Sequence, residues 1–297
     1  MSIPRYAVVT PVRDEEQYLP QTIASMCAQT LKPWRWVVVN DGSRDKTGEL
    51  IEAAAAQHPW ISVVHRKDRG TRQAGSGVIA SFYDGYELVS RDALDYVVKF
   101  DGDLSFAPDY FEKCLREFDA DAKLGIAGGT LCKLENGEMV PEFNADPPFH
   151  VCGPTKIYRR ECFKAIEGLI VAPGWDTVDL IKANMLGWST RSFPHIRLIH
   201  LRRTGAAYGL SKDGVKNGLA NYITGYHPLF MAAKCLRRML RNPFSLEGLC
   251  LWIGFMKGYV KRIHQVEDRA MIRYLRQQQF RALTFRSNLW SQAPDHQ

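Results

Sequence analysis

Short apolar runs rich in β-branched residues alternate with longer segments of helical spacing over the first hundred residues. The four apolar runs are Tyr6–Val12, residues 36–39, Ile61–His65 and Tyr96–Phe100. The intervening segments with helical spacing are residues 18–30, 46–57 and 71–89. Strands that alternate with helices at this pace form βαβ units, whose sheet carries helices on both faces. The sequence therefore predicts an α/β fold with a mainly parallel sheet flanked by helices.

The regular alternation weakens after Asp103. Residues 135–149 are rich in Pro, Gly, Asn and acidic residues, which predicts a loop. Residues 176–186 have helical spacing with the acidic end first, and residues 192–201 return as a strand.

Basic residues are concentrated in the C-terminal third of the chain. The 297 residues carry a net charge of +7, but residues 205–297 hold 14 Lys and Arg against 5 Asp and Glu. Residues 1–204 hold 25 Lys and Arg against 27 Asp and Glu. With 45% hydrophobic and 24% charged residues, the chain is neither disordered nor fibrous. We expect a catalytic domain over residues 1–204 and a helical basic extension over residues 205–297.

The seven cysteines are widely spaced and odd in number, with no Cys-x-x-Cys pair. This pattern disfavours a disulfide framework or a thiolate zinc site and fits a reducing compartment. The N-terminus lacks the apolar segment of a signal peptide, and no stretch reaches 18 uninterrupted apolar residues. We therefore expect a cytoplasmic protein.

Two segments of the basic extension have the pattern of surface helices. In residues 227–241, the apolar residues of one broad helical face are Leu229, Ala232, Ala233, Leu236, Met239 and Leu240. The basic residues, mostly on the other face, are Lys234, Arg237, Arg238 and Arg241. Residues 246–260 are largely apolar but too short for a membrane span.

Three interpretations of this basic extension were compared. The helices could pack on the core with a solvated basic face, or rest on an anionic membrane at the inner face of the cell membrane. Nucleic-acid binding is disfavoured because no recognised module is present.

Polar residues follow three of the predicted strands. Asp101-Gly102-Asp103 ends the fourth strand, and its paired carboxylates are hard ligands that suit Mg²⁺ or Mn²⁺, although a solvated turn has the same pattern. Arg13-Asp14-Glu15 follows the first strand, and Asn40-Asp41-Gly42-Ser43 follows the second. The latter suits either a turn with a helix cap or a carboxylate that accepts from a nucleobase N–H. Since open α/β sheets bind ligands at the carboxyl ends of their strands, this recurrence predicts a binding site there.

The ordered set of motifs resembles the family 2 glycosyltransferases of the GT-A fold. The matching pieces are Thr10-Pro11-Val12-Arg13-Asp14-Glu15-Glu16, Val39-Asn40-Asp41-Gly42-Ser43 with Asp45 and Thr47, and Asp101-Gly102-Asp103. The resemblance covers residues 5–204. It implies a metal-dependent, hexosyltransferase-like enzyme that uses Mn²⁺ or Mg²⁺ and transfers a sugar from a nucleoside diphosphate donor with inversion. The motif Gln-x-x-Arg-Trp of processive synthases is missing, which implies single addition.

The resemblance also implies roles for individual residues. Pro11, Arg13, Glu15 and Asp41 would line the nucleoside pocket, with Asp41 facing the base. Arg69 and Arg72 would border the donor, and Asp101 would contact it. Asp103 would hold the metal ion. His200, at the end of a later strand, would bind metal or diphosphate, or simply be a satisfied strand-end histidine.

The candidate catalytic base is Asp176. Gly174-Trp175-Asp176-Thr177-Val178-Asp179-Leu180 takes the place of the acidic pair that opens a helix in this family. By that alignment Asp176 would take the proton of the acceptor hydroxyl, whereas Asp179 would be structural. An ordinary acidic residue at a helix N-terminus has the same pattern. Lys156, beneath the acceptor, could offset donor charge.

The leading hypothesis is an inverting glycosyltransferase that uses a nucleoside diphosphate sugar, with UDP favoured, and a sugar or lipid-linked acceptor. It would act in polysaccharide or glycolipid biosynthesis. A sugar-phosphate nucleotidyltransferase is an alternative, but residues 10–15 lack the glycine-rich phosphate loop of that class. A non-enzymatic basic binding protein would leave the carboxylates at three strand ends unexplained.

Overall fold

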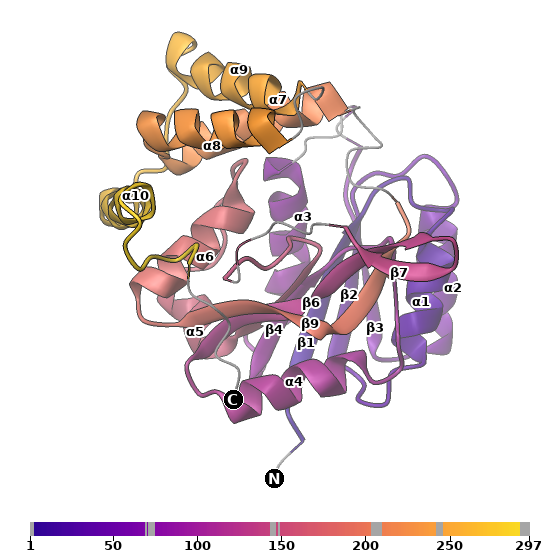
Figure 1. Cartoon of the computed structure of the whole chain (residues 1–297). Helices are drawn as coiled ribbons and strands as arrows, with labels where there is room; N and C mark the ends of the chain where they lie inside the picture. Colours follow the sequence, from indigo (N-terminus) through magenta and orange to yellow (C-terminus); the bar gives the residue numbers. More distant parts are fainter. Residues whose placement is uncertain are drawn as a thin grey trace.

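Nine strands form one mixed, curled sheet in the computed structural model, which describes residues 3–68, 70, 75–142, 147, 149–202, 210–241 and 246–291. The strands are β1 (Tyr6–Val12), β2 (Arg35–Asn40), β3 (Ile61–His65), β4 (Tyr96–Phe100), β5 (Leu104–Phe106), β6 (Leu124–Glu135), β7 (Glu138–Pro141), β8 (Thr155–Arg159) and β9 (Ser189–His200). Their order is β3-β2-β1-β4-β8-β6-β9-β5, with β7 on β6. Figure 1 shows the sheet between helices, with further helices stacked beyond one of its faces.

Helices lie on both faces of this sheet. The helices are α1 (Leu19–Cys27), α2 (Thr47–Gln57), α3 (Ser76–Glu87), α4 (Tyr110–Ala120), α5 (Arg160–Ala165), α6 (Trp175–Met185), α7 (Leu210–Thr224), α8 (Pro228–Arg241), α9 (Glu247–Val260) and α10 (Arg269–Leu283). None of the helices in the described ranges is long and apolar enough to cross a membrane.

The predicted α/β fold is confirmed, and the sheet is parallel where the sequence alternates regularly. Strands β3, β2, β1 and β4 are mutually parallel. Beyond β4 the sheet is mixed, because β8 pairs with β4 and β6 in antiparallel fashion while β9 runs parallel to β6. This mixed half corresponds to the chain after Asp103, where the sequence pattern loses its regularity.

The prediction of a loop over residues 135–149 was wrong in its first part. Glu135 pairs with Glu138, so β6 and β7 form a hairpin with a two-residue turn. Asn136 and Gly137 make that turn with φ angles of 52° and 85°, the left-handed conformation that an Asn-Gly pair adopts readily. This dipeptide was the sequence signal for the hairpin. Residues 143–146 and 148 lie outside the described residues.

Alternate side chains of the strands supply two hydrophobic clusters, one on each face of the sheet. Tyr6 and Val8 pack on the face of α1, α2 and α4, whereas Ala7 and Val9 pack on the face of α3, α5 and α6. The second cluster continues without a break into the C-terminal helices.

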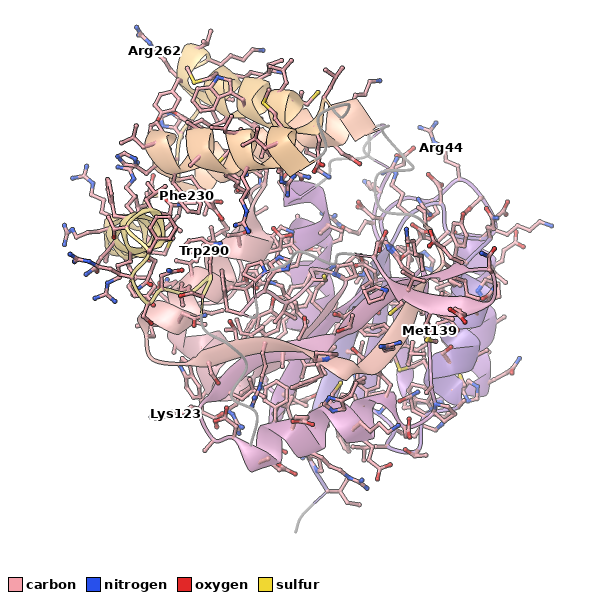
Figure 2. The ribbon with its side chains drawn as sticks, viewed as in Figure 1. Arg44, Lys123, Met139, Phe230, Arg262 and Trp290 are labelled. Atoms are coloured by element: carbon pink, nitrogen blue, oxygen red, sulfur yellow. The ribbon has the colours of Figure 1, made fainter. Side chains whose placement is uncertain are left out.

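Aromatic contacts join the C-terminal segment to the sheet region. The ring of Trp290 lies 5.7 Å from Phe149, before β8, and 5.0 Å from Phe230 in α8 (Figure 2). The described residues after position 209 therefore share a core with the sheet region, and the predicted boundary at residues 204/205 lies outside the described residues.

Glycines bring α7 and α9 into backbone contact. A Cβ on Gly218 would overlap the carbonyl oxygen of Leu251, and one on Gly254 would overlap that of Val215. Such close approach requires glycine at both positions. The two helices therefore form a tightly packed pair, which lies at the top of the molecule in Figure 1.

Candidate active site

The Asp101-Gly102-Asp103 turn lies directly against the end of β1. A Cβ on Gly102 would be 2.5 Å from Cγ1 of Val12, so only glycine allows this approach. The backbone amide of Asp101 donates to the carbonyl of Pro154 at 3.0 Å. The turn is thus fixed between β1 and the chain that leads into β8.

A chain of ion pairs connects residues from four parts of the sequence around this turn. Asp103 Oδ2 lies 3.5 Å from His200 Nε2 and 3.6 Å from Arg202 Nε. Arg202 also pairs with Glu15, and His200 Nδ1 lies 2.8 Å from Glu142 Oε2. The structure therefore brings together three predicted residues, Glu15, Asp103 and His200. We call these five side chains the central ion network.

The pKa values of His200 and Asp103 are shifted by their partners in this network. Burial opposes protonation of His200, but its hydrogen bonds to Asp103 and Glu142 and their negative charges outweigh that effect and raise its pKa to about 10. For Asp103, burial opposes ionisation, but His200, Arg202 and Lys99 outweigh it and lower its pKa. The imidazolium thus lies between two carboxylates.

The donor set at Asp103 fits a divalent cation that also binds a diphosphate. Asp103 Oδ1 is buried and has no hydrogen-bond partner among the described residues. No group of three or more His, Cys, Asp or Glu side chains within those residues is arranged to hold a metal ion. Mg²⁺ and Mn²⁺ sites that bind substrate phosphates often use only one or two protein ligands. His200 could serve as a second ligand only in its neutral form.

The predicted nucleoside residues lie together at the ends of β1 and β2. Arg13 donates to the carbonyl of Asp41 at 2.9 Å and to Asp68 Oδ1 at 2.6 Å. Arg66, just after β3, donates to Asp41 Oδ1 at 2.7 Å. Pro11 pairs in register with Val39 one strand away. Sequence reasoning missed Arg66 and Asp68, although their position after the third strand was an available signal.

The loops after β1 and β2 hold each other in place. The amide of Glu15 donates to Thr47 Oγ1 at 2.8 Å, and the amide of Arg44 donates to Asp14 Oδ1 at 2.8 Å. Asp14 has a φ of 52°, a left-handed conformation that Asp tolerates better than most residues. The two motifs therefore fold as one unit, which positions the backbone around Asp41.

A buried lysine connects the Asp101 turn to the chain before β8 and to the start of α6. Lys99 in β4 is only 2% exposed, and it pairs with Asp101 and donates to the carbonyl of Gly153 at 3.2 Å. Its ammonium lies 5.2 Å from the centre of the Trp175 ring, within cation–π range. Sequence reasoning missed Lys99, whose signal was a lone charge inside an apolar strand.

Asp176 is half-buried at the second position of α6. The preceding Gly174 has a φ of 88°, which turns the chain into the helix. A Cβ on Gly153 would be 3.6 Å from Cβ of Asp176, so the candidate base lies beside the segment that Lys99 contacts. Burial, together with the negative charge of Asp176, raises the pKa of Tyr226. Tyr226 belongs to the connection between α7 and α8, so this connection also lies near Asp176.

Asp179 has a structural environment, as the sequence alignment predicted. Lys156 Nζ lies 2.7 Å from both of its carboxylate oxygens, and Tyr158 donates to Oδ2 at 2.6 Å. Because Lys156 is fully buried in this pair, its charge is already compensated, and the prediction that it offsets donor charge was wrong. Arg69 and Arg72 lie outside the described residues.

Comparison with known families identifies the chain. The sequence model described as Glycosyl transferase family 2 matches residues 7–166, which is more than half of the chain. The chain belongs to glycosyl transferase family 2. The resemblance seen in the strand-end motifs is thereby confirmed, and the matched region contains Pro11, Arg13, Glu15, Asp41, Asp101 and Asp103.

Curated relatives of this family member share only part of their length with it. A chondroitin synthase of Pasteurella multocida is 27% identical over 48% of this chain and 15% of its own. A polyprenol monophosphomannose synthase of Mycolicibacterium smegmatis is 32% identical over 43% of this chain and 48% of its own. An undecaprenyl-phosphate 4-deoxy-4-formamido-L-arabinose transferase of Pectobacterium carotovorum is 33% identical over 36% of this chain and 31% of its own.

Solved structures share the fold over nearly the whole chain. The mannosyltransferase PcManGT of Pyrobaculum calidifontis, in complex with GDP-Man and Mn²⁺, superposes with a TM-score of 0.56 at 16% identity, over 97% of this chain and 77% of its own. TarS residues 1–349 of S. aureus superpose with a TM-score of 0.52 at 16% identity, over 93% of this chain and 77% of the TarS chain. These neighbours confirm the predicted GT-A fold.

Proposed function

We propose that this family member is a metal-dependent, inverting glycosyltransferase. It transfers a sugar from a nucleoside diphosphate sugar to an acceptor hydroxyl in polysaccharide or glycolipid biosynthesis. The observation that carries the proposal is the central ion network, which gathers Glu15, Asp103 and His200 at the carboxyl ends of the parallel strands. One oxygen of Asp103 in that network is buried and has no hydrogen-bond partner within the described part of the chain.

The donor's nucleoside would lie along the loops after β1 and β2. Asp41 would accept from the base, while Arg13 holds its backbone carbonyl and Arg66 holds its carboxylate in place. Two structural neighbours are described with GDP-Man and with UDP-GlcNAc, which supports a nucleoside diphosphate sugar. We favour UDP among the donors.

Asp103 would hold a divalent ion, and His200 would serve as a second ligand only after metal binding displaced its proton. The ion would neutralise negative charge on the departing diphosphate. Arg202 contributes a fixed positive charge beside Asp103. Asp101 would orient the donor, and Lys99 holds the carboxylate of Asp101 in place.

Asp176 would act as the general base. The N-terminus of α6 favours a negative charge at this position, which keeps a carboxylate available to accept a proton. A direct attack by the acceptor oxygen inverts the anomeric carbon without an enzyme-linked intermediate. The acceptor would be a sugar or a lipid-linked acceptor, a choice supported by relatives named as polyprenol and undecaprenyl-phosphate enzymes.

The proposal is tested by thermal unfolding with a panel of UDP-, GDP- and dTDP-sugars in Mn²⁺. A donor at a hundred times its dissociation constant should stabilise the native state by about 2.7 kcal/mol. We expect one nucleotide class to raise the midpoint only when Mn²⁺ is present. If no nucleotide sugar shifts the midpoint of the wild type, the proposed donor site is wrong.

A further inference from the structure

The apolar face of α8 points away from the protein core. The six apolar residues of that face are all exposed: Leu229, Ala232, Ala233, Leu236, Met239 and Leu240. Exposure of the four larger ones ranges from 43% for Met239 to 74% for Leu240. A helix on the surface of a water-soluble domain normally turns this face inward. The orientation of α8 is therefore the reverse of the usual one.

The inner side of α8 is occupied by other residues. Met231 and Cys235 are buried there, and the Lys234 ammonium lies 5.1 Å from the centre of the Tyr226 ring. Arg238 pairs with Glu247 at the start of α9. Lys234 is thus only partly exposed and lies beside the core contacts, whereas the large aliphatic side chains, like Arg237, are exposed.

Helix α9 extends the exposed apolar surface. Leu249, Ile253, Met256 and Val260 lie on one stripe at helical spacing, and Val260 is 80% exposed. A Cβ on Gly248 would lie 2.6 Å from Cγ of Met239, so this stripe adjoins the outer face of α8. We call the outer residues of both helices the α8–α9 apolar surface. Its members are Leu229, Ala232, Ala233, Leu236, Met239, Leu240, Leu249, Ile253, Met256 and Val260.

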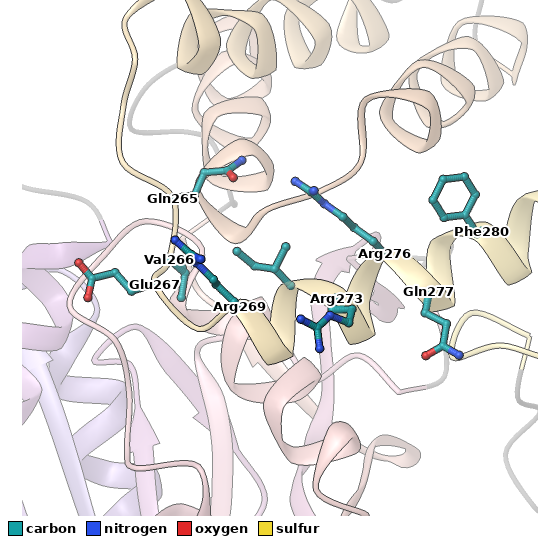
Figure 3. Close-up of a pocket in the computed structure, with 9 residues that line it drawn as sticks. Gln265, Val266, Glu267, Arg269, Arg273, Arg276, Gln277 and Phe280 are labelled. Carbon is teal, nitrogen blue, oxygen red and sulfur yellow. The ribbon is translucent and has the colours of Figure 1, made fainter.

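A basic groove of about 900 Å³ lies along α10. Figure 3 shows Arg269, Arg273 and Arg276 projecting from that helix, with Gln265 and Glu267 on the chain before it. Arg276 donates to the carbonyl of Gly225 at 2.9 Å. Within the part of the chain that is described, none of the three guanidinium groups pairs with a carboxylate. We call this feature the α10 groove.

The α10 groove adjoins the apolar surface through His227 and Phe280. The rings of these residues lie 4.6 Å apart, at the start of α8 and in α10. The pKa of His227 is lowered by burial and by the positive charge of Arg276, which places that arginine beside the N-terminal end of α8. Leu229, a member of the apolar surface, is two residues further along α8.

We propose that the C-terminal helices dock on an anionic lipid leaflet. The α8–α9 apolar surface enters the interfacial region of the leaflet, and the α10 groove binds lipid phosphate groups. An apolar face beside basic side chains is the combination that interfacial helices use. A second copy of the chain is a poorer occupant, because a symmetric contact would bring like arginine clusters together. This docking does not depend on the proposed reaction, because its evidence comes only from α8, α9 and α10.

Cosedimentation of the full chain with vesicles tests this proposal. The vesicles contain phosphatidylcholine alone, or phosphatidylcholine with phosphatidylglycerol. We expect binding to the mixed vesicles at low salt and weaker binding at high salt, because salt screens the basic charges. Equal binding to both vesicle types would overturn the role of the α10 groove. No binding, with a doubled mass in light scattering, would assign the surface to a homodimer instead.

Matched variants separate the two parts of the docking surface. Removing two charges in Arg269→Gln/Arg273→Gln should weaken binding to the mixed vesicles about 25-fold, at about fivefold per charge. Leu236→Asp/Leu240→Asp should weaken binding to both vesicle types. The controls are Lys123→Gln and Leu134→Asp, which alter exposed residues of the sheet region. If either control weakens binding as much as its partner variant, the proposed surface is wrong.

Discussion

The charged side chains at the strand ends of the sheet region are buried and paired, whereas the C-terminal helices turn aliphatic side chains outward. Asp103 and Glu15 are each less than a tenth exposed, and both pair with Arg202. Leu240 in α8 is 74% exposed. Both arrangements are the reverse of the usual one, because carboxylates are normally exposed to solvent and leucines are normally buried.

The difference between the regions indicates what each surface contacts. Buried, partly unsatisfied charge is stable only where the fold holds it in place, and it suits a site for a charged substrate. An exposed apolar face has no such internal compensation and indicates an external partner.

Removing a charge from the buried Lys156–Asp179 pair should have the largest effect. Asp179→Asn leaves Lys156 buried without its partner, and we expect the free energy of unfolding to fall by about 3–5 kcal/mol. Urea unfolding measures the loss, with the exposed Asp119→Asn as the control. Unchanged stability with abolished turnover would instead make Asp179 the base and shift our alignment by one helical turn.

The second prediction concerns the central ion network. Asp103→Asn removes the charge that would hold the divalent ion, and we expect transfer to fall by about a hundredfold to a thousandfold. Turnover measured against Mn²⁺ concentration provides the readout, and thermal unfolding shows whether the variant is folded. A folded variant with wild-type turnover, or full wild-type activity in excess EDTA, would exclude the proposed metal site.

The third prediction separates chemistry from donor binding. Asp176→Asn should lower turnover by at least about a hundredfold, because general-base catalysis is lost, while donor affinity stays nearly the same. Steady-state kinetics and the donor-induced rise in unfolding temperature measure the two quantities. Loss of donor binding equal to the loss of turnover would place Asp176 in the donor site.

The smallest expected effect tests the reversed orientation of α8. Leu240→Asp should change the free energy of unfolding by less than about 0.5 kcal/mol without vesicles, because that side chain is exposed. Leu251→Ala, on the buried side of α9, should cost about 2–5 kcal/mol. If Leu240→Asp is as destabilising as Leu251→Ala, the apolar face of α8 is covered by protein in solution.

The parallel half of the fold was predictable because its strands carry strong local signals. Tyr6–Val12, Ile61–His65 and Tyr96–Phe100 were predicted at the bounds that the structure has. The mixed half was less predictable, since pairing of β8 between β4 and β6 depends on contacts distant in sequence. The spacing of apolar residues also identifies one face of a helix but does not show whether that face lies against the protein or in solvent. The sequence therefore did not predict the orientation of α8.

The candidate site was predicted in part for a similar reason. Glu15 and Asp103 were singled out because they follow predicted strands, and His200 because of the family resemblance; the structure places all three in one network. Arg66, Lys99 and Arg202 escaped notice because their roles depend on partners elsewhere in the chain. The sequence shows that a residue lies at the end of a strand, but only the folded sheet determines which charged side chain that residue contacts.

Release of free nucleoside diphosphate from a nucleotide sugar would show whether the central ion network belongs to a glycosyltransferase. In the presence of Mn²⁺, the wild type should slowly hydrolyse one member of a UDP-, GDP- and dTDP-sugar panel, and Asp103→Asn should not. No pyrophosphate should appear when the protein is given a nucleoside triphosphate and a sugar phosphate. Pyrophosphate release without nucleoside diphosphate release, or equal hydrolysis by wild type and Asp103→Asn, would contradict a glycosyltransferase centred on the central ion network.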